Sequence, residues 1–102
     1  MDKEMLGRFS DPAMLILASL AGGQKHGYAM MEDIEANAKV HLGPGTLYGA
    51  LSRLDQLGLI EALPADERRR PYRLTARGAA SLRQYLISLQ SFVSLGLKRL
   101  ET

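Results

Sequence analysis

Apolar residues recur at helical spacing in the first third of the chain. Ser10-Asp11-Pro12 is typical of a helix start, because Ser caps free amide groups and Pro tolerates the first turn. The apolar positions that follow predict a buried first helix ending at Gly22-Gly23: Leu15, Leu17, Ala18 and Leu20. After a polar turn over residues 24–27, an apolar side predicts a second helix from about Tyr28 to Asn37: Met30, Met31 and Ile34.

A third helix is predicted to start at Gly43-Pro44 and to stop at Gly58. Its apolar residues fall at i, i+3, i+4 and i+7 and form one core-facing stripe: Leu47, Ala50, Leu51 and Leu54. The opposite side should face solvent and carries small and polar residues, with Tyr48 on its flank: Gly45, Gly49, Ser52, Arg53 and Gln56. Because these side chains are mostly small, this side of the helix can come close to another molecule.

Two strands are predicted after the third helix, over residues 59–63 and 71–75. The seven residues between them contain one Pro and five charges, including Arg68, Arg69 and Arg70. The pattern indicates a hairpin with a charged tip.

A long final helix follows Thr75-Ala76-Arg77-Gly78. Its apolar residues alternate spacings of four and three, as in a heptad seam: Leu82, Leu86, Leu89, Val93, Gly96 and Leu100. Tyr85, Phe92 and Leu95 widen the stripe beyond the needs of one small core, which predicts a homodimer. A membrane-surface helix is disfavoured because the polar face lacks basic residues. We divide the chain into a domain over 1–78 and a dimerisation helix over 79–102, together one structural unit.

Composition narrows the function classes. The 102 residues suit one soluble domain, and the chain has no Cys and no Trp. The N-terminus lacks a signal-peptide layout, so we expect a cytoplasmic protein. We expect no enzymatic activity and no cofactor, because neither a nucleophile elbow nor a phosphate-binding loop occurs. We expect no metal site, because His26 and His41 are 15 positions apart and no acidic or thiol cluster supports them. His26 and His41 are expected to be a turn residue and a strand-edge residue.

Three helices followed by a hairpin indicate a winged helix-turn-helix, mainly α with a small β-hairpin, in which the third helix enters the DNA major groove. Thr46 and Tyr48 at the start of this helix are expected to anchor phosphates. The expected base-reading residues are Ser52, Arg53 and Gln56. Arg68, Arg69 and Arg70 suit phosphates or a narrow minor groove, although a solvated turn is the alternative. Tyr48 is equally suited to packing against the second helix.

Several segments together resemble the PadR family of transcriptional regulators: His26-Gly27-Tyr28, the run from Pro44 to Leu51, Arg53-Leu54, Gly58-Leu59-Ile60, and Tyr72-Arg73-Leu74-Thr75 with Gly78. The resemblance implies a dimeric repressor that binds a two-fold operator. It also implies that Tyr28, Thr46, Tyr48 and the hairpin arginines contact DNA. Two features depart from the family pattern: the hairpin tip contains no Gly, and Leu89 stands where some drug-sensing relatives have a Trp.

The leading hypothesis is therefore a homodimer that represses transcription from a double-stranded DNA operator, with half-sites about one DNA turn (roughly 34 Å) or a multiple of it apart. The alternative is a winged-helix adaptor that binds another protein through the same helix. A small apolar or aromatic effector is a further expectation, with a pocket formed by Tyr85, Leu89 and Phe92. No membrane partner is expected.

Overall fold

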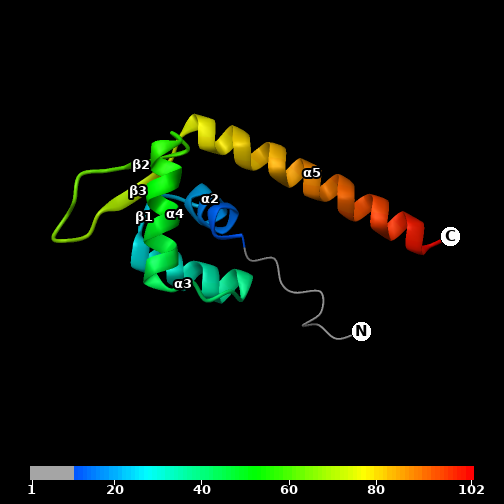
Figure 1. Cartoon of the computed structure of the whole chain (residues 1–102), viewed down its shortest axis with the longest axis horizontal. Coiled ribbons are helices and arrows are strands. Elements are labelled where there is room, and N and C mark those ends of the chain that lie inside the picture. Colours follow the sequence, from blue (N-terminus) through cyan, green and yellow to red (C-terminus); the bar gives the residue numbers. More distant parts are fainter. Residues whose placement is uncertain (1–10) are drawn as a thin grey trace.

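A computed structural model of the chain describes residues 11–102. Within this range the elements follow the expected order: α2 Pro12–Ala21, β1 Lys25–His26, α3 Gly27–Ala38, α4 Pro44–Gln56, β2 Ile60–Ala62, β3 Pro71–Leu74 and α5 Ala76–Leu100. The small antiparallel sheet lies to one side of α2, α3 and α4, and the hairpin of β2 and β3 projects outward from it (Figure 1). The long helix α5 extends away from the body on the other side. The architecture confirms the predicted fold class, a winged helix-turn-helix with a long C-terminal helix.

The first described helix, α2, lies at the centre of the molecule, where it contacts α3, α4, α5 and β3. The Asp11 side chain caps it by accepting from the Ala13 amide at 3.0 Å. Ser10, the other residue of the expected start signal, lies outside the described residues. Ala18 is exposed, contrary to the prediction, and Ile16 is fully buried instead. Because α2 is packed on several sides, it buries a wider face than the predicted stripe.

The two helices of the helix-turn-helix, α3 and α4, start close to the predicted positions. α3 begins at Gly27 and buries Met30 and Ile34. α4 begins after Gly43 and buries the expected stripe of Leu47, Leu51 and Leu54. Gly58, with a φ of +76°, follows the end of α4 as predicted, in a conformation that glycine adopts most easily.

The sheet has three strands in the order β1-β3-β2, all antiparallel. β2 and β3 form the predicted hairpin, in register with Glu61 opposite Arg73. The polar turn expected over residues 24–27 is wrong, because Lys25 and His26 form β1 and pair with Tyr72 and Pro71. A two-residue strand has no periodicity of its own, so only its pairing with β3 reveals it.

The long helix α5 starts in the core and leaves it. Thr75 caps the helix by accepting from the Gly78 amide at 3.0 Å. Leu82 is only 6% exposed and belongs to the core of its own chain. From residue 90 to the end of the chain every residue is exposed. The molecule is consequently elongated, with extents of 56 × 29 × 20 Å.

Candidate nucleic-acid interface

The exposed side of α4 carries residues that were predicted from the sequence to contact DNA. Burial of the leucine stripe turns five polar or aromatic side chains outward: Thr46, Tyr48, Ser52, Arg53 and Gln56. Gly45 and Gly49 lie on the same side, and a Cβ at either position would meet nothing within 4 Å. This side of the helix is therefore open and shallow, as a groove-binding surface requires.

Two hollows flank α4 and divide these residues. The hollow on the hairpin side, about 330 Å³, is lined by Tyr48, Ser52, Asp55, Arg70 and Tyr72. The hollow on the α2 side, about 260 Å³, is lined among others by Ala13, Thr46, Gly49 and Arg53. Tyr48 and Ser52 thus share a surface with the hairpin, whereas Thr46 and Arg53 face the start of α2.

The hairpin tip is a two-residue turn made without glycine. Asp66 and Arg69 exchange two backbone hydrogen bonds, of 2.7 and 2.9 Å. Glu67 and Arg68 between them both have positive φ, +55° and +97°. Positive φ at both central residues is the pattern of a type I′ turn, which suits the twist of a hairpin. The tip therefore has a defined shape despite its lack of Gly.

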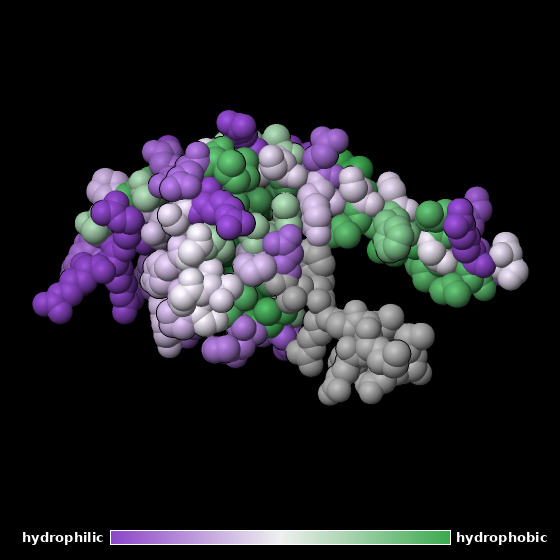
Figure 2. Space-filling model, in the orientation of Figure 1, coloured by the Kyte–Doolittle hydropathy of each residue, from purple (hydrophilic) through white to green (hydrophobic). Residues whose placement is uncertain are grey.

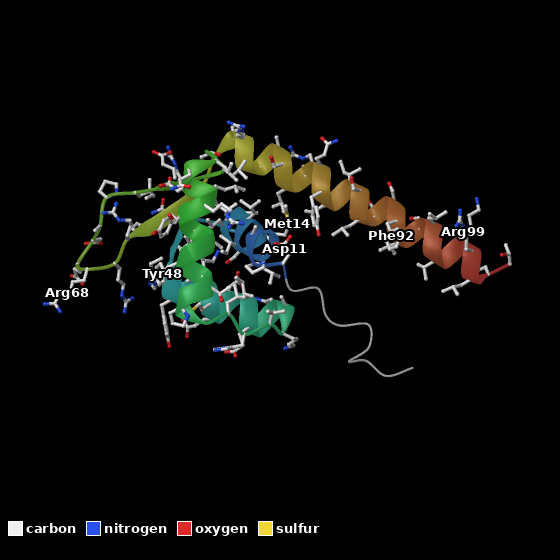
Figure 3. The ribbon with its side chains drawn as sticks, in the orientation of Figure 1. Asp11, Met14, Tyr48, Arg68, Phe92 and Arg99 are labelled. Carbon is white, nitrogen blue, oxygen red and sulfur yellow. The ribbon has the colours of Figure 1, made fainter. Side chains whose placement is uncertain are left out.

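The three consecutive arginines differ in their surroundings. Arg68 lies at the outermost point of the hairpin (Figure 3). The Arg69 guanidinium Nη1 lies 3.1 Å from Nε2 of His26, in β1. Arg70 donates to the Leu63 carbonyl at 3.1 Å, across the hairpin. All three remain exposed; the sequence predicted that they lie at the hairpin tip, but it did not predict the contacts of Arg69 and Arg70.

The start of α3 packs against α4 at Gly27. A Cβ at Gly27 would lie 2.5 Å from the Tyr48 hydroxyl and 3.1 Å from Leu47, so a side chain there would push the tyrosine away. Tyr28, the next residue, is exposed beside this contact. The sequence did not single out His26 or Gly27 for this position, although both belong to the segment that carries the family resemblance.

Electrostatics on the hairpin face are mixed. Arg73 donates to Glu61 through two nitrogens, at 2.7 and 3.1 Å, as a cross-strand pair. Partial burial raises the pKa of Tyr72, and the neighbouring Tyr48 raises it further. Tyr72 lines the hollow beside α4, and a phenol hydroxyl can both donate and accept a hydrogen bond.

The two histidines, His26 and His41, belong to no group of three or more possible metal ligands within residues 11–102. Their expected positions are wrong: His26 is a strand residue, and His41 lies in the loop before α4, where it pairs with Glu35 at 3.1 Å.

The outer part of α5 exposes apolar side chains on several turns (Figure 2). Phe92 is 69% and Leu100 83% exposed, and Leu86 and Val93 are also exposed. Tyr85 and Leu89 are half-buried, and Gly96 is open. Leu82 is buried within its own chain, so the exposed part of the expected seam begins at Leu86.

Leu97 also belongs to the exposed apolar side chains of α5. It was not among the predicted interface residues, although it follows Val93 by four positions, which is one helical turn. No helix among residues 11–102 is long and apolar enough to cross a membrane.

Comparison with known proteins gives one family. The family model described as "Transcriptional regulator PadR-like family" matches residues 16–84. An uncharacterized 37.1 kDa protein in transposon TN4556 of Streptomyces fradiae is 46% identical over 71 residues, which are 70% of this chain and 21% of that protein. The chain thus spans about a fifth of the length of this curated relative.

Solved structures share the fold over most of both chains. A transcriptional regulator from Clostridium thermocellum has a TM-score of 0.75 at 27% identity, over 84% of this chain and 89% of its own. A PadR family regulator from Eggerthella lenta also has a TM-score of 0.75, at 28% identity, over 88% and 81%. A PadR family regulator from Clostridium difficile has a TM-score of 0.79 at 23% identity, over 87% and 97%.

Proposed function

Because this chain belongs to the PadR-like family of transcriptional regulators, we propose that it is a homodimeric repressor of a two-fold DNA operator. The observation that carries the proposal is the meeting of three elements at Gly27. There the start of α3 touches Tyr48 of α4, and the neighbouring His26 touches Arg69 of the hairpin. One surface therefore presents a groove-sized helix beside a basic hairpin, as winged-helix DNA recognition requires.

Each contact surface has a separate role in this proposal. Thr46, Tyr48 and Tyr28 hold phosphates near the helix starts, where free amides and the helix dipole favour anions. Ser52, Arg53 and Gln56 reach base edges in the major groove. Arg68, Arg69 and Arg70 contact the backbone or an adjacent minor groove. Two copies joined through α5 place two such surfaces on one operator.

Salt dependence tests the arginine hairpin. With Arg68, Arg69 and Arg70 replaced by Ala, we expect weaker binding to the protein's own promoter DNA. The slope of log K against log salt should fall by about one for each phosphate that the variant no longer neutralises. The triple variant Arg83→Ala, Lys98→Ala, Arg99→Ala is the matched control, because it also removes three positive charges, from exposed positions of α5. Arg99 lies at the opposite end of the molecule from Arg68 (Figure 3).

Two outcomes would contradict the proposal. Equal affinity for promoter and scrambled DNA would exclude sequence-specific regulation through this surface. A triple variant with unchanged affinity and slope would favour the adaptor alternative, in which α4 binds a protein and the hairpin is only solvated.

The proposal includes a small-molecule effector that binds at α5. Its support is the half-buried Tyr85 and Leu89 beside the exposed Phe92. A ligand there would alter DNA binding only by binding two arrangements of the dimer unequally. Thermal-shift screening with and without promoter DNA tests this, and a compound that stabilises the protein in competition with DNA is the expected result.

A further inference from the structure

Hydrogen-bond donors face both ring nitrogens of His26. The Ala29 backbone amide lies 3.3 Å from Nδ1, and the Arg69 guanidinium Nη1 lies 3.1 Å from Nε2. An amide N–H and a guanidinium can only donate. A neutral imidazole has one acceptor nitrogen and one N–H, and a protonated ring has two N–H groups. At least one ring N–H therefore meets another donor, and an acceptor is missing.

The position of the missing acceptor follows from the role of the Ala29 contact. The amides in the first turn of α3 have no partner inside the helix, and Nδ1 caps one of them. A neutral ring that keeps this cap carries its proton on Nε2. The Nε2–H group and the Nη1–H group of Arg69 then lie side by side as two donors. One oxygen atom of an anion can accept from both.

The surroundings of the pair favour an anion. The two groups line a hollow of about 680 Å³ between β1 and the hairpin tip. The charged residues lining it are Lys25, Arg68 and Arg69 against Asp66 and Glu67, three positive charges against two negative ones. Asp66 and Glu67 are the competing acceptors within the chain. The positive end of the α3 dipole adds to the attraction, because His26 is its N-cap.

We propose that His26 Nε2 and Arg69 Nη1 form an oxyanion site for a phosphate group. When the protein is bound to DNA, one phosphate of the DNA backbone fills it; this part rests on the DNA-binding function proposed above. Inorganic phosphate has the same chemistry and should occupy the same site weakly. One phosphate of the DNA is then held from two sides, by Arg69 of the hairpin and by His26 at the start of α3.

The first experiment uses inorganic phosphate and the full chain. Phosphate is titrated against chloride at constant ionic strength while ¹⁵N and ¹H signals of the histidine rings and arginine side chains are followed. We expect saturable shifts at His26 and Arg69 but not at His41, the internal control. His26→Asn and His26→Asp both keep an acceptor that caps α3. Both should abolish the response at Arg69, Asn by lacking the Nε2 group and Asp by presenting a carboxylate to the guanidinium.

The second experiment is a double-mutant cycle on DNA affinity. We expect His26→Asn to weaken binding about ten-fold for each chain in the complex, as for one hydrogen bond to a charged group. In an Arg69→Ala background, His26→Asn should weaken DNA binding by less than about two-fold, because the phosphate that both residues contact is no longer held there. Thermal unfolding of each variant checks that the fold is intact.

The outcomes separate the two proposals. Additive effects in the cycle, or no response at His26 to phosphate and to DNA alike, overturn the phosphate site. A saturable phosphate response at His26 in a protein that binds no DNA supports the oxyanion site and overturns the DNA-binding function. Equal shifts at His26 and His41 would indicate an adventitious ion only and would also overturn the site.

Discussion

Gly78 in the first turn of α5 lies against the backbone of Leu59, the residue before β2. A Cβ there would lie 1.9 Å from the Leu59 carbonyl oxygen and 2.8 Å from Leu74. Three residues earlier, Thr75 donates to the Gly58 carbonyl at 2.7 Å and caps α5. The missing side chain of Gly78 thus allows α5 to start against the base of the hairpin.

Gly78→Ala should destabilise the protein by about 3 kcal/mol or more, because the new methyl group overlaps backbone that cannot move freely. Chemical denaturation at one fixed protein concentration measures this. Gly49→Ala in α4 is the control, since a Cβ there meets nothing within 4 Å. It should raise the free energy of unfolding by about 0.5–1 kcal/mol through helix propensity. A Gly78→Ala protein as stable as wild type would contradict the close approach.

A second residue-scale feature joins α2 to α3. The buried Ser19 donates to the Asp33 carboxylate at 2.6 Å, and Asn37 donates to it at 2.7 Å. The Ser19 hydrogen bond, followed by that of Asn37, lowers the pKa of Asp33 below its ordinary value of 3.8. The ionised carboxylate is therefore the form that the fold stabilises.

A lowered pKa in the fold means that this stabilisation is complete above about pH 3.8 and declines as the pH falls further. Asp33→Asn should reduce stability at pH 6 and flatten the decline below pH 4. Urea denaturation across pH 2–7 measures both effects. Glu32→Gln, at an exposed position of the same helix, should leave the profile nearly unchanged. Parallel profiles for Asp33→Asn and wild type would show that Asp33 is not coupled to folding.

At the scale of elements, the hairpin turn combines a favourable geometry with unfavourable residues. Glu67 and Arg68 both adopt positive φ, which costs L residues with long side chains about 1–2 kcal/mol each. The double variant Glu67→Asn, Arg68→Gly introduces the residues that type I′ turns prefer. It should raise the free energy of unfolding by about 1–2 kcal/mol, measured by chemical denaturation.

Arg68→Ala separates conformational strain from charge, because it removes the same guanidinium and keeps a Cβ at positive φ. We expect no gain in stability from this variant. An equal gain in both variants would show that charge repulsion at the tip, and not backbone conformation, limits the hairpin.

Elements with their own periodicity were predictable from the sequence, and features made by distant pairing were not. The stripe from Leu47 to Leu54 predicted α4 because core burial repeats along one helix face. β1 was missed because Lys25 and His26 gain strand geometry only from β3. The contact between His26 and Arg69 spans 43 positions, so no local pattern indicates it. The exposure of the candidate residues on α4 was predictable, but their division between two hollows was not.

At the scale of the whole molecule, α5 carries apolar side chains that no other part of residues 11–102 covers. Phe92→Glu should weaken or abolish a dimer formed through this helix, because it places a charge among apolar groups. Sedimentation equilibrium should give about twice the chain mass of 11.2 kDa for wild type and about the single mass for the variant.

Ser91→Glu is the matched control, because it adds the same charge at the neighbouring position on the polar side of α5. It should leave the wild-type mass unchanged. A wild-type protein that sediments as a single chain, or a Phe92→Glu protein that associates as tightly as wild type, would contradict a dimer through this helix.

The anchoring of α5 at Gly78 also has a mechanical consequence. The helix has 25 residues and is therefore about 37 Å long. One end is fitted against Leu59, at the base of the hairpin, and the other end is free of the body. A tilt of about 5° at the anchored end moves the far end by about 3 Å over this length. α5 is thus a lever that converts a small angular change beside the hairpin into a displacement as large as a hydrogen-bond length.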